Sequence, residues 1–217
     1  MWFDQTATKN TWADAARHLC KNDRRLAEVI ERVGPCTIAP RRDYFPSLCR
    51  AIFAQQLSTK VAATLVNRFR AQFPRRLPTP LLLRDKLRSD NGTFMRACGL
   101  SKQKAGYLLD LSTHFVEGRI NTRKLRKMSD QEVIDALVEV KGIGRWTAEM
   151  FLMFVLNRPD VLPVDDLGLR EGVREVYELR KRPLALRLQE IAEPWKPWRS
   201  VGTWYIWRRG SGGVSLK

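Results

Sequence analysis

The sequence predicts an all-α fold, and three observations lead to that prediction. Apolar residues recur at helical spacing along most of the 217 residues. No segment combines sustained apolar–polar alternation with the β-branched residues that favour strands. The stretches between the helical patterns are only a few residues long, which is typical of connections between packed helices. We therefore expect helices packed on helices, without a sheet.

The helical patterns follow one another along the chain with short breaks. The first covers residues 11–33, where Leu19 and Leu26 are among the apolar residues at helical spacing. Further patterns lie at residues 46–56, 59–72, 103–117, 130–139, 145–157 and 166–180. Three prolines within residues 74–80 interrupt the chain before another short helix. The glycine-rich end, residues 210–217, predicts a flexible tail.

The charge of the chain indicates a nucleic-acid partner. Lys and Arg number 39 against 23 Asp and Glu, which gives a net charge of +16. The isoelectric point near 10.3 lies in the range expected of nucleic-acid-binding domains. The basic residues are scattered as pairs rather than gathered in a disordered tail. Charge alone is also compatible with an ordinary solvated basic surface.

The sequence disfavours a membrane or secreted protein, and it disfavours a metalloprotein. No apolar run is long enough to cross a bilayer, and the N-terminus lacks the layout of a signal peptide. We therefore expect an intracellular protein, in a bacterial cytoplasm or nucleoid or a eukaryotic nucleus. The cysteines lack the spacings of zinc or iron–sulfur sites, so we expect reduced thiols and no metal cofactor. These cysteines are Cys20, Cys36, Cys49 and Cys98.

A tight turn between two helical patterns is the most informative motif. Ser129 and Glu132 have the spacing of a capping box at the start of the first helix. That helix ends in a Gly-Ile-Gly turn, and Ile143 is expected to fill the gap between the two helices. Gly142 and Gly144 leave backbone N–H groups open to an anion at a helix N-terminus, where the dipole also favours negative charge. This geometry predicts a clamp for DNA phosphate that is independent of base sequence.

The motif resembles the signature of a known superfamily. Residues 137–148, followed by residues 162–166, are similar to the helix-hairpin-helix (HhH-GPD) DNA glycosylases. Within that superfamily they resemble the alkylation-repair branch, the 3-methyladenine DNA glycosylases of bacterial inducible and yeast types. The resemblance runs over residues 44–209 and includes Gln55–Ser58, Gly99–Lys104 and Trp195–Ser200.

The resemblance also implies an arrangement of domains. It implies a compact helical core of two lobes with the active site between them. Residues 1–40 would pack with a C-terminal lobe formed by residues 165–209. Residues 41–164 would form the middle lobe, which contains the hairpin.

The resemblance places the catalytic carboxylate at Asp166. We expect Pro163 to stiffen the approach, Asp165 to cap the next helix, and Asp166 to lie in its first turn. A helix N-terminus favours a negative charge. Loss of a base from deoxyribose develops positive charge on the sugar, which a nearby carboxylate stabilises while it orients the attacking water. Taken in isolation, two consecutive aspartates are more often only a helix cap.

Some relatives also cleave the DNA strand, and the residue at the position that would carry this second activity is Trp146. Bifunctional relatives have a lysine there, which attacks the sugar and leads to strand cleavage. Tryptophan cannot act as a nucleophile, so we expect water to attack and an intact abasic site to remain.

Tryptophans are the candidate lining of the base pocket. A flipped base stacks between aromatic side chains, and a positively charged alkylated purine gains about 0.5–2 kcal/mol from each indole face. By resemblance, Trp146 and Trp207 match pocket positions. Trp204 is a third candidate, with core packing an equally good explanation for it.

Further DNA contacts are expected from two segments. The loop Gln55, Gln56, Leu57 and Ser58 matches the family's wedge, which fills the space left by the flipped base. Leu57 has the character to insert but also fits a core, and Ser58 also fits a helix cap. Lys102 and Lys104 fit either phosphate contact or simple solvation, and Arg145 follows the hairpin. Relatives also often hold a monovalent cation on backbone carbonyls of the hairpin.

These residues lead to one hypothesis and two alternatives. The hypothesis is a monomeric, monofunctional DNA glycosylase that excises alkylated purines of the 3-methyladenine and 7-methylguanine type from double-stranded DNA, in base excision repair. We expect no cofactor, and no iron–sulfur cluster because no cysteine follows Cys98. One alternative is a non-catalytic protein that binds damaged DNA. The other is a glycosylase of the same fold for deaminated or mismatched bases.

Overall fold

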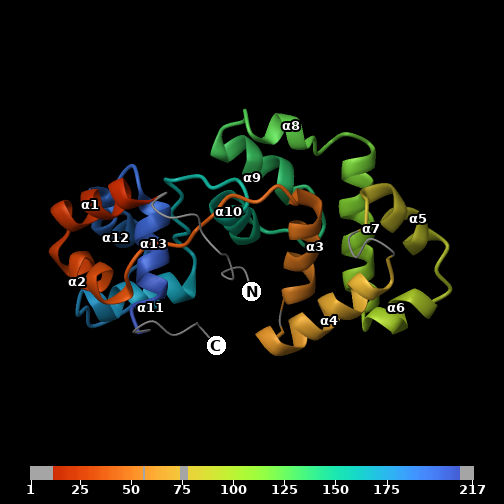
Figure 1. Ribbon diagram of the computed structural model, residues 1–217, viewed down its shortest axis with the longest axis horizontal. Coiled ribbons are helices and arrows are strands. Elements are labelled where there is room, and N and C mark those ends of the chain that lie inside the picture. The colour runs from red at the N-terminus through yellow and green to blue at the C-terminus, as the bar shows by residue number, and fades with distance from the viewer. Residues whose placement is uncertain (1–11, 56, 74–77, 211–217) are drawn as a thin grey trace. The chain divides into compact units, whose positions relative to one another are not determined.

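The structure is a computed structural model, which describes residues 12–55, 57–73 and 78–210. Gln56 of the wedge loop and residues 211–217 of the expected tail lie outside the described residues. The described part consists of α-helices and one 3₁₀ helix, η1, and contains no strand (Figure 1). The prediction of an all-α fold is therefore confirmed.

The helices follow one another along the chain with short connections. In chain order they are α1 Ala13–Asn22, α2 Arg24–Val33, α3 Tyr44–Ala54, α4 Thr59–Ala71, α5 Pro80–Arg88, α6 Thr93–Cys98, α7 Lys102–Val116, α8 Thr122–Leu125, α9 Asp130–Val138, α10 Arg145–Phe154, α11 Leu167–Val176, α12 Ala185–Ile191, η1 Glu193–Trp195 and α13 Arg199–Trp207. None of the described helices has both the length and the apolar character required to cross a membrane.

The chain divides into two compact units. Unit 1 contains residues 41–151, and unit 2 contains the described residues before 41 together with those after 151. The boundary expected from the sequence follows residue 164, whereas the structure places it inside α10. The reason is that the last residues of this helix join the core of unit 2, where the Phe154 ring stacks on Trp207 with centroids 5.9 Å apart.

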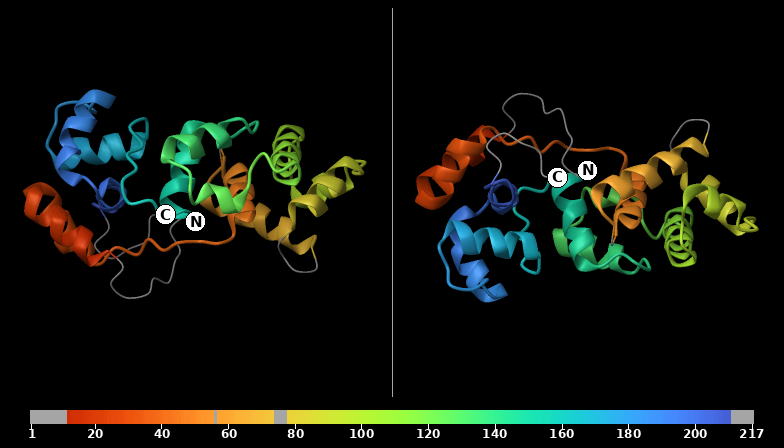
Figure 2. Two further views of the ribbon diagram at one scale, coloured as in Figure 1. Left: turned by 90° about the horizontal axis from the view of Figure 1, so that it is seen from above. Right: turned by 90° about the horizontal axis from the view of Figure 1, so that it is seen from below.

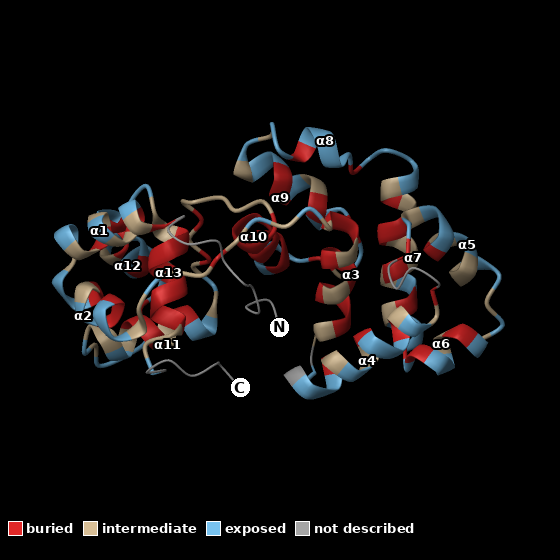
Figure 3. Ribbon diagram, in the orientation of Figure 1, coloured by how far each residue is buried: buried red, intermediate tan, exposed pale blue. Residues whose placement is uncertain are grey.

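Unit 1 is built around α3. Leu48, Ile52 and Phe53 of this helix are fully buried, and Figure 3 shows the buried positions concentrated along α3 and the facing side of α7. Phe53 and Phe69 of α4 lie 4.8 Å apart between ring centroids, and Phe94 of α6 lies 6.2 Å from Phe69. This aromatic cluster holds α3, α4 and α6 together, because large rings bury much apolar surface.

Unit 2 joins helices from both ends of the chain. Figure 2 shows α1 and α2, in red, together with the blue C-terminal helices in both views, and α2 contacts α13. One carboxylate links these segments. Asp23 caps α2 by accepting from the Leu26 amide at 3.0 Å, and it also accepts from the indole of Trp195 at 2.8 Å and from the Tyr177 hydroxyl. The helical pattern over residues 11–33 therefore forms two helices, α1 and α2, which meet at Asp23.

Two later helices also end before the predicted residue. The pattern over 145–157 ends at Phe154, and Asn157 beyond it has a φ of 60°. The pattern over 166–180 ends at Val176, and Glu178 has a φ of 55°. A positive φ is incompatible with a continuing right-handed helix, so the apolar periodicity runs past the end of each helix.

Candidate functional site

The capped helix α9 leads into the hairpin, residues 139–144. The Ser129 hydroxyl accepts from the Glu132 amide at 3.3 Å, and the Glu132 carboxylate accepts from the Ser129 amide at 2.6 Å. The predicted capping box is therefore confirmed. The Ser129 amide and the Ser129 hydroxyl both donate to the carboxylate, and these two hydrogen bonds hold the pKa of Glu132 below its ordinary value.

The two glycines of the hairpin have different tasks. Gly142 has a φ of +83°, and a Cβ there would collide with the Tyr107 ring, so this turn requires glycine. Gly144 precedes α10 and faces open space, so a Cβ at this position would meet no atom within 4 Å. Ile143 between them is 4% exposed, as expected of a residue that fills the gap between the helices. Gly144 and Arg145 thus present their amides at an accessible helix N-terminus, where intrahelical acceptors are lacking.

The side chain of Arg145 is 54% exposed and forms an ion pair within unit 1. Its Nε donates to the carboxylate of Glu149 at 3.1 Å, and Glu149 is buried. The guanidinium is therefore oriented by Glu149 and remains open to solvent beside the backbone amide.

The two lysines at the start of α7 differ from each other. Ser101 caps this helix, accepting from the Lys104 amide at 3.2 Å. Lys102 is exposed, as a phosphate contact requires. The ammonium of Lys104 instead donates to the carbonyls of Phe53 at 2.8 Å and Gln55 at 2.9 Å. Two of the three N–H donors of Lys104 are therefore used within unit 1, whereas Lys102 keeps its ammonium in solvent.

The wedge loop, residues 55–58, follows the C-terminal end of α3. The amide of the Gln55 side chain donates to the Gly142 carbonyl at 2.6 Å, which ties the loop to the hairpin. Leu57 is 36% exposed and so is available for insertion rather than buried in the core. Ser58 is the N-cap of α4 and accepts from the Val61 amide at 3.5 Å.

Asp166 lies at the start of α11 in unit 2. Its Oδ1 accepts from the Leu169 amide at 2.5 Å and from the indole N–H of Trp207 at 2.9 Å. Asp166 is itself the N-cap of the helix. The expected division of roles, with Asp165 as the cap and Asp166 in the first turn, is therefore wrong by one residue. Asp165 is exposed.

Two neighbours determine the surroundings of this carboxylate. Trp207 is only 9% exposed and stacks on Phe154, so its indole N–H is fixed in place. Gly168 lies beside the same oxygen, and a Cβ there would be 3.2 Å from Oδ1 of Asp166 and 3.4 Å from Nε1 of Trp207. Gly168 is not among the residues expected from the motif, because a glycine in the first turn of a helix is an unspecific signal.

The other two candidate tryptophans differ in exposure. Trp146, on α10, is 45% exposed, which leaves indole surface for a ligand. Trp204 is 3% exposed, with the Tyr205 ring against its edge and the Arg208 guanidinium 4.2 Å from its ring centroid. Trp204 therefore belongs to the core of unit 2, and its assignment to the base pocket is corrected.

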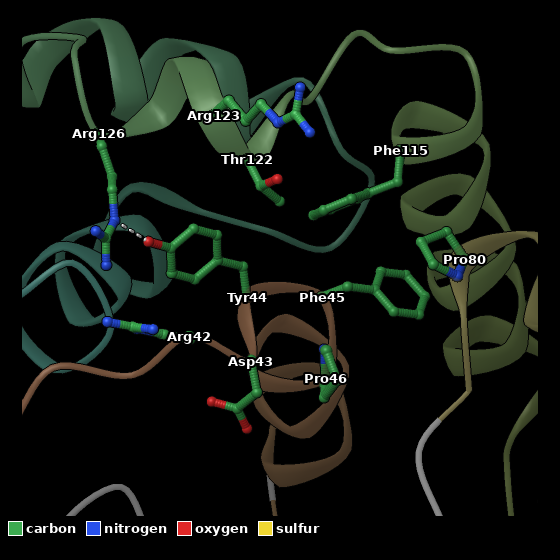
Figure 4. A pocket seen from close by; sticks show the side chains of 10 residues that line it. All are labelled: Arg42, Asp43, Tyr44, Phe45, Pro46, Pro80, Phe115, Thr122, Arg123 and Arg126. Carbon is green, nitrogen blue, oxygen red and sulfur yellow. Dashed lines mark hydrogen bonds between the residues drawn. The ribbon is translucent and has the colours of Figure 1, made fainter. Parts of the chain in front are cut away.

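A basic pocket of about 930 Å³ lies elsewhere on unit 1 (Figure 4). Its lining includes Arg42, Arg123 and Arg126, and Arg126 donates to the Tyr44 hydroxyl at 2.5 Å. The wall also contains Asp43, which is paired with Arg41 and Arg50 outside the lining. None of the predicted site residues lines this pocket. It lies at the N-terminal end of α3, whereas the wedge loop follows the other end, about 16 Å along an 11-residue helix.

Comparison with known proteins gives consistent similarities. Residues 49–197 match the family described as "HhH-GPD superfamily base excision DNA repair protein". DNA-3-methyladenine glycosylase 1 of Schizosaccharomyces pombe is 35% identical over 196 residues, which are 88% of this chain and 82% of that protein. The alkylbase DNA glycosidase-like protein mag2 of the same yeast is 31% identical over 199 residues, 89% of this chain and 92% of its own. The solved structure of the S. pombe 3-methyladenine DNA glycosylase in complex with abasic DNA has a TM-score of 0.79 at 34% identity, covering 90% of this chain and 96% of that one.

Proposed function

Because the chain belongs to the HhH-GPD superfamily of base excision DNA repair proteins, we propose that it is a monofunctional DNA glycosylase that removes alkylated purines from double-stranded DNA. The observation that carries the proposal is the carboxylate of Asp166, held at the N-terminus of α11 by two N–H donors. A helix cap needs only the Leu169 amide as donor, whereas the second donor, the Trp207 indole, also sets the direction of the carboxylate.

Asp166 is the proposed catalytic residue. As the bond from the sugar C1′ to the purine nitrogen breaks, its electron pair leaves with the base and positive charge develops on the sugar. The carboxylate stabilises that charge and accepts a proton from the water that attacks C1′. An alkylated purine already carries a positive charge, so it departs as a neutral base. This reaction needs neither a metal nor another cofactor.

The hairpin and the wedge loop are the proposed DNA contacts. Backbone amides at the start of α10 receive a phosphate, and Gly144 leaves the approach open. The solved relative in complex with abasic DNA supports DNA as the partner. Leu57 extends from the wedge loop toward solvent and is the proposed inserting side chain, since its neighbour Ser58 is used as a helix cap.

The base is proposed to contact Trp146. Its exposed indole face attracts a cationic alkylpurine by about 0.5–2 kcal/mol. Trp207 contributes chiefly through the hydrogen bond that orients Asp166, because little of its ring is exposed. Trp146 also occupies the position at which a lysine would form a Schiff base. We therefore expect the product to be an intact abasic site, released by a protein that acts as a monomer.

Asp166→Asn tests the proposal. The substitution keeps the size of the side chain and removes its charge, so we expect the release of methylated purines from duplex DNA to fall by at least about 100-fold. Affinity for abasic DNA should persist, because the hairpin is unchanged. Single-turnover release of 3-methyladenine and 7-methylguanine, with fluorescence anisotropy for binding, measures both.

Each other outcome has a defined meaning. A wild-type protein that binds abasic DNA but releases no methylated, deaminated or ethenoadenine base is a damage-binding protein without chemistry. Release limited to deaminated or mismatched bases would replace the substrate class. Equal rates for wild type and Asp166→Asn would remove Asp166 from the mechanism. Strand cleavage on a denaturing gel would contradict the monofunctional assignment.

A further inference from the structure

One face of α7 contacts both of the proposed DNA-binding elements of unit 1. Lys104, Tyr107 and Asp110 are spaced three residues apart and therefore lie along one side of the helix. Lys104 donates to two carbonyls at the end of α3, and the Tyr107 ring packs against Gly142 of the hairpin. The carboxylate of Asp110 accepts from the backbone amide of Lys141 in the hairpin at 2.9 Å. The helix thus runs alongside the start of the wedge loop and the hairpin in turn.

The ammonium of Lys104 binds the C-terminal end of α3. The last carbonyls of a helix lack intrahelical donors, and a cation there is favoured by the helix dipole. The ammonium supplies two of those donors, at 2.8 Å to Phe53 and 2.9 Å to Gln55. No ion pair with a carboxylate accompanies it within the described part of the chain. Burial of the side chain lowers the pKa of Lys104 below its ordinary value.

Gln55 extends this contact to the hairpin. Its carbonyl receives the Lys104 ammonium, and its side-chain amide donates to the Gly142 carbonyl at 2.6 Å. A Cβ on Gly142 would lie 2.2 Å from the Tyr107 ring, so the hairpin backbone packs closely against α7 at this point. The first residue of the wedge loop is therefore held at both its backbone and its side chain.

We propose that Lys104 is a positioning residue which, through Gln55, holds the wedge loop at a set distance from the hairpin. Phosphate binding at the hairpin then fixes where the wedge enters the duplex. This inference rests on the proposed glycosylase function. Misplacement of the wedge by about 1 Å is enough to slow base release substantially. Loss of the Lys104 ammonium therefore affects base flipping, whereas the initial binding of DNA depends on the hairpin and is retained.

Lys104→Met is the direct test. Methionine keeps the unbranched apolar stem and lacks the ammonium. We expect single-turnover release of methylated purines to fall about tenfold or more. The affinity for undamaged duplex should change less than about threefold, because it depends on the hairpin. In DNA with 2-aminopurine next to the lesion, the fluorescence of the probe rises when wedge insertion unstacks the bases. With Lys104→Met, most of this rise should be lost.

A matched control and a second variant separate positioning from general destabilisation. Lys127→Met removes the same charge from an exposed site of unit 1 just after α8, and it should behave as wild type. Gln55→Met breaks the contact to the hairpin without leaving a buried charge. Because Lys104 and Gln55 act on one loop, the double variant should be little slower than the slower single variant.

The outcomes distinguish this inference from the proposed function. A wild-type protein without glycosylase activity refutes the proposed function and, with it, the role of Lys104. An active wild type with an unchanged fluorescence rise in Lys104→Met refutes the inference alone. Additive effects of Lys104→Met and Gln55→Met also refute it. Restoration of the fluorescence rise by Lys104→Arg, which retains donors for the two carbonyls, supports it.

Discussion

Asp166 shows how much of the candidate chemistry depends on single contacts. Its Oδ1 receives both the Leu169 amide and the Trp207 indole, so the carboxylate has one orientation relative to α11. Trp207 in turn is fixed by its stacking on Phe154. Gly168 lies beside this group and leaves room for the carboxylate because it has no side chain. A Cβ there would lie 3.2 Å from Oδ1, which is closer than in ordinary packing.

Gly168→Ala should separate activity from stability. A Cβ 3.2 Å from Oδ1 of Asp166 displaces the carboxylate, and we expect turnover to fall about tenfold. Alanine is a better helix former than glycine by up to about 1 kcal/mol, so the thermal midpoint should stay unchanged or rise. Single-turnover base release and thermal melting measure the two effects. An unchanged rate would show that the carboxylate tolerates the methyl group.

Glu171 should make stability depend on acid pH. Hydrogen bonds from Arg174 and Arg182 lower its pKa from 4.5 to about 2. Since the folded state has the lower pKa, this group stabilises the fold above pH 4.5, and the contribution is lost as the pH falls toward about 2. Wild type should lose more stability than Glu171→Gln between about pH 6 and pH 3, as measured by urea unfolding. Parallel pH profiles would argue against the contribution.

The hairpin is the element in which local sequence and packing agree best. Its capping box, its plug Ile143 and its two glycines were all expected from the motif. The structure adds that the glycines are not equivalent: Gly142 has a positive φ and faces a ring, whereas Gly144 faces open space. The positive φ therefore requires glycine at position 142, whereas at position 144 the lack of a side chain leaves the backbone open to a ligand.

Gly142→Ala should unfold the hairpin locally. The left-handed φ costs about 1–2 kcal/mol for alanine, and the Tyr107 ring must move, so we expect a total loss of about 2–4 kcal/mol in unfolding free energy. Affinity for abasic DNA should fall with it. Gly144→Ala is the control for stability and should cost under about 1 kcal/mol. Denaturant unfolding of the two variants compares them, and equal costs would contradict the distinction.

At the scale of the whole molecule, charge and division into units are the dominant features. The net charge of +16 gives the chain a long-range attraction for DNA that is not specific to sequence. The hairpin, the wedge loop and α7 belong to unit 1, and Asp166 belongs to unit 2. Each unit can therefore be altered separately, with binding and chemistry as separate readouts.

DNA binding should weaken steeply with salt. Each phosphate neutralised contributes about −0.9 to the slope of log affinity against log salt concentration, and about three to six contacts would give about −3 to −5. Fluorescence anisotropy of duplex DNA between about 50 and 300 mM salt measures the slope. Asp166→Asn should share the wild-type slope. A slope near zero would show that the basic surface is not used for DNA.

The sequence by itself determined the helical fold and the capped hairpin, because these depend on short-range periodicity, caps and spacing. Its resemblance to the family pointed to Asp166. Only the tertiary structure decided that the Trp207 indole orients Asp166, that Trp204 is core, and that the Lys104 ammonium binds the end of α3. It also placed the division between the units inside α10. The physical reason is that these features depend on residues far apart in the chain. No local sequence pattern predicts the contact between Lys104 and Phe53 or the contact between Asp166 and Trp207.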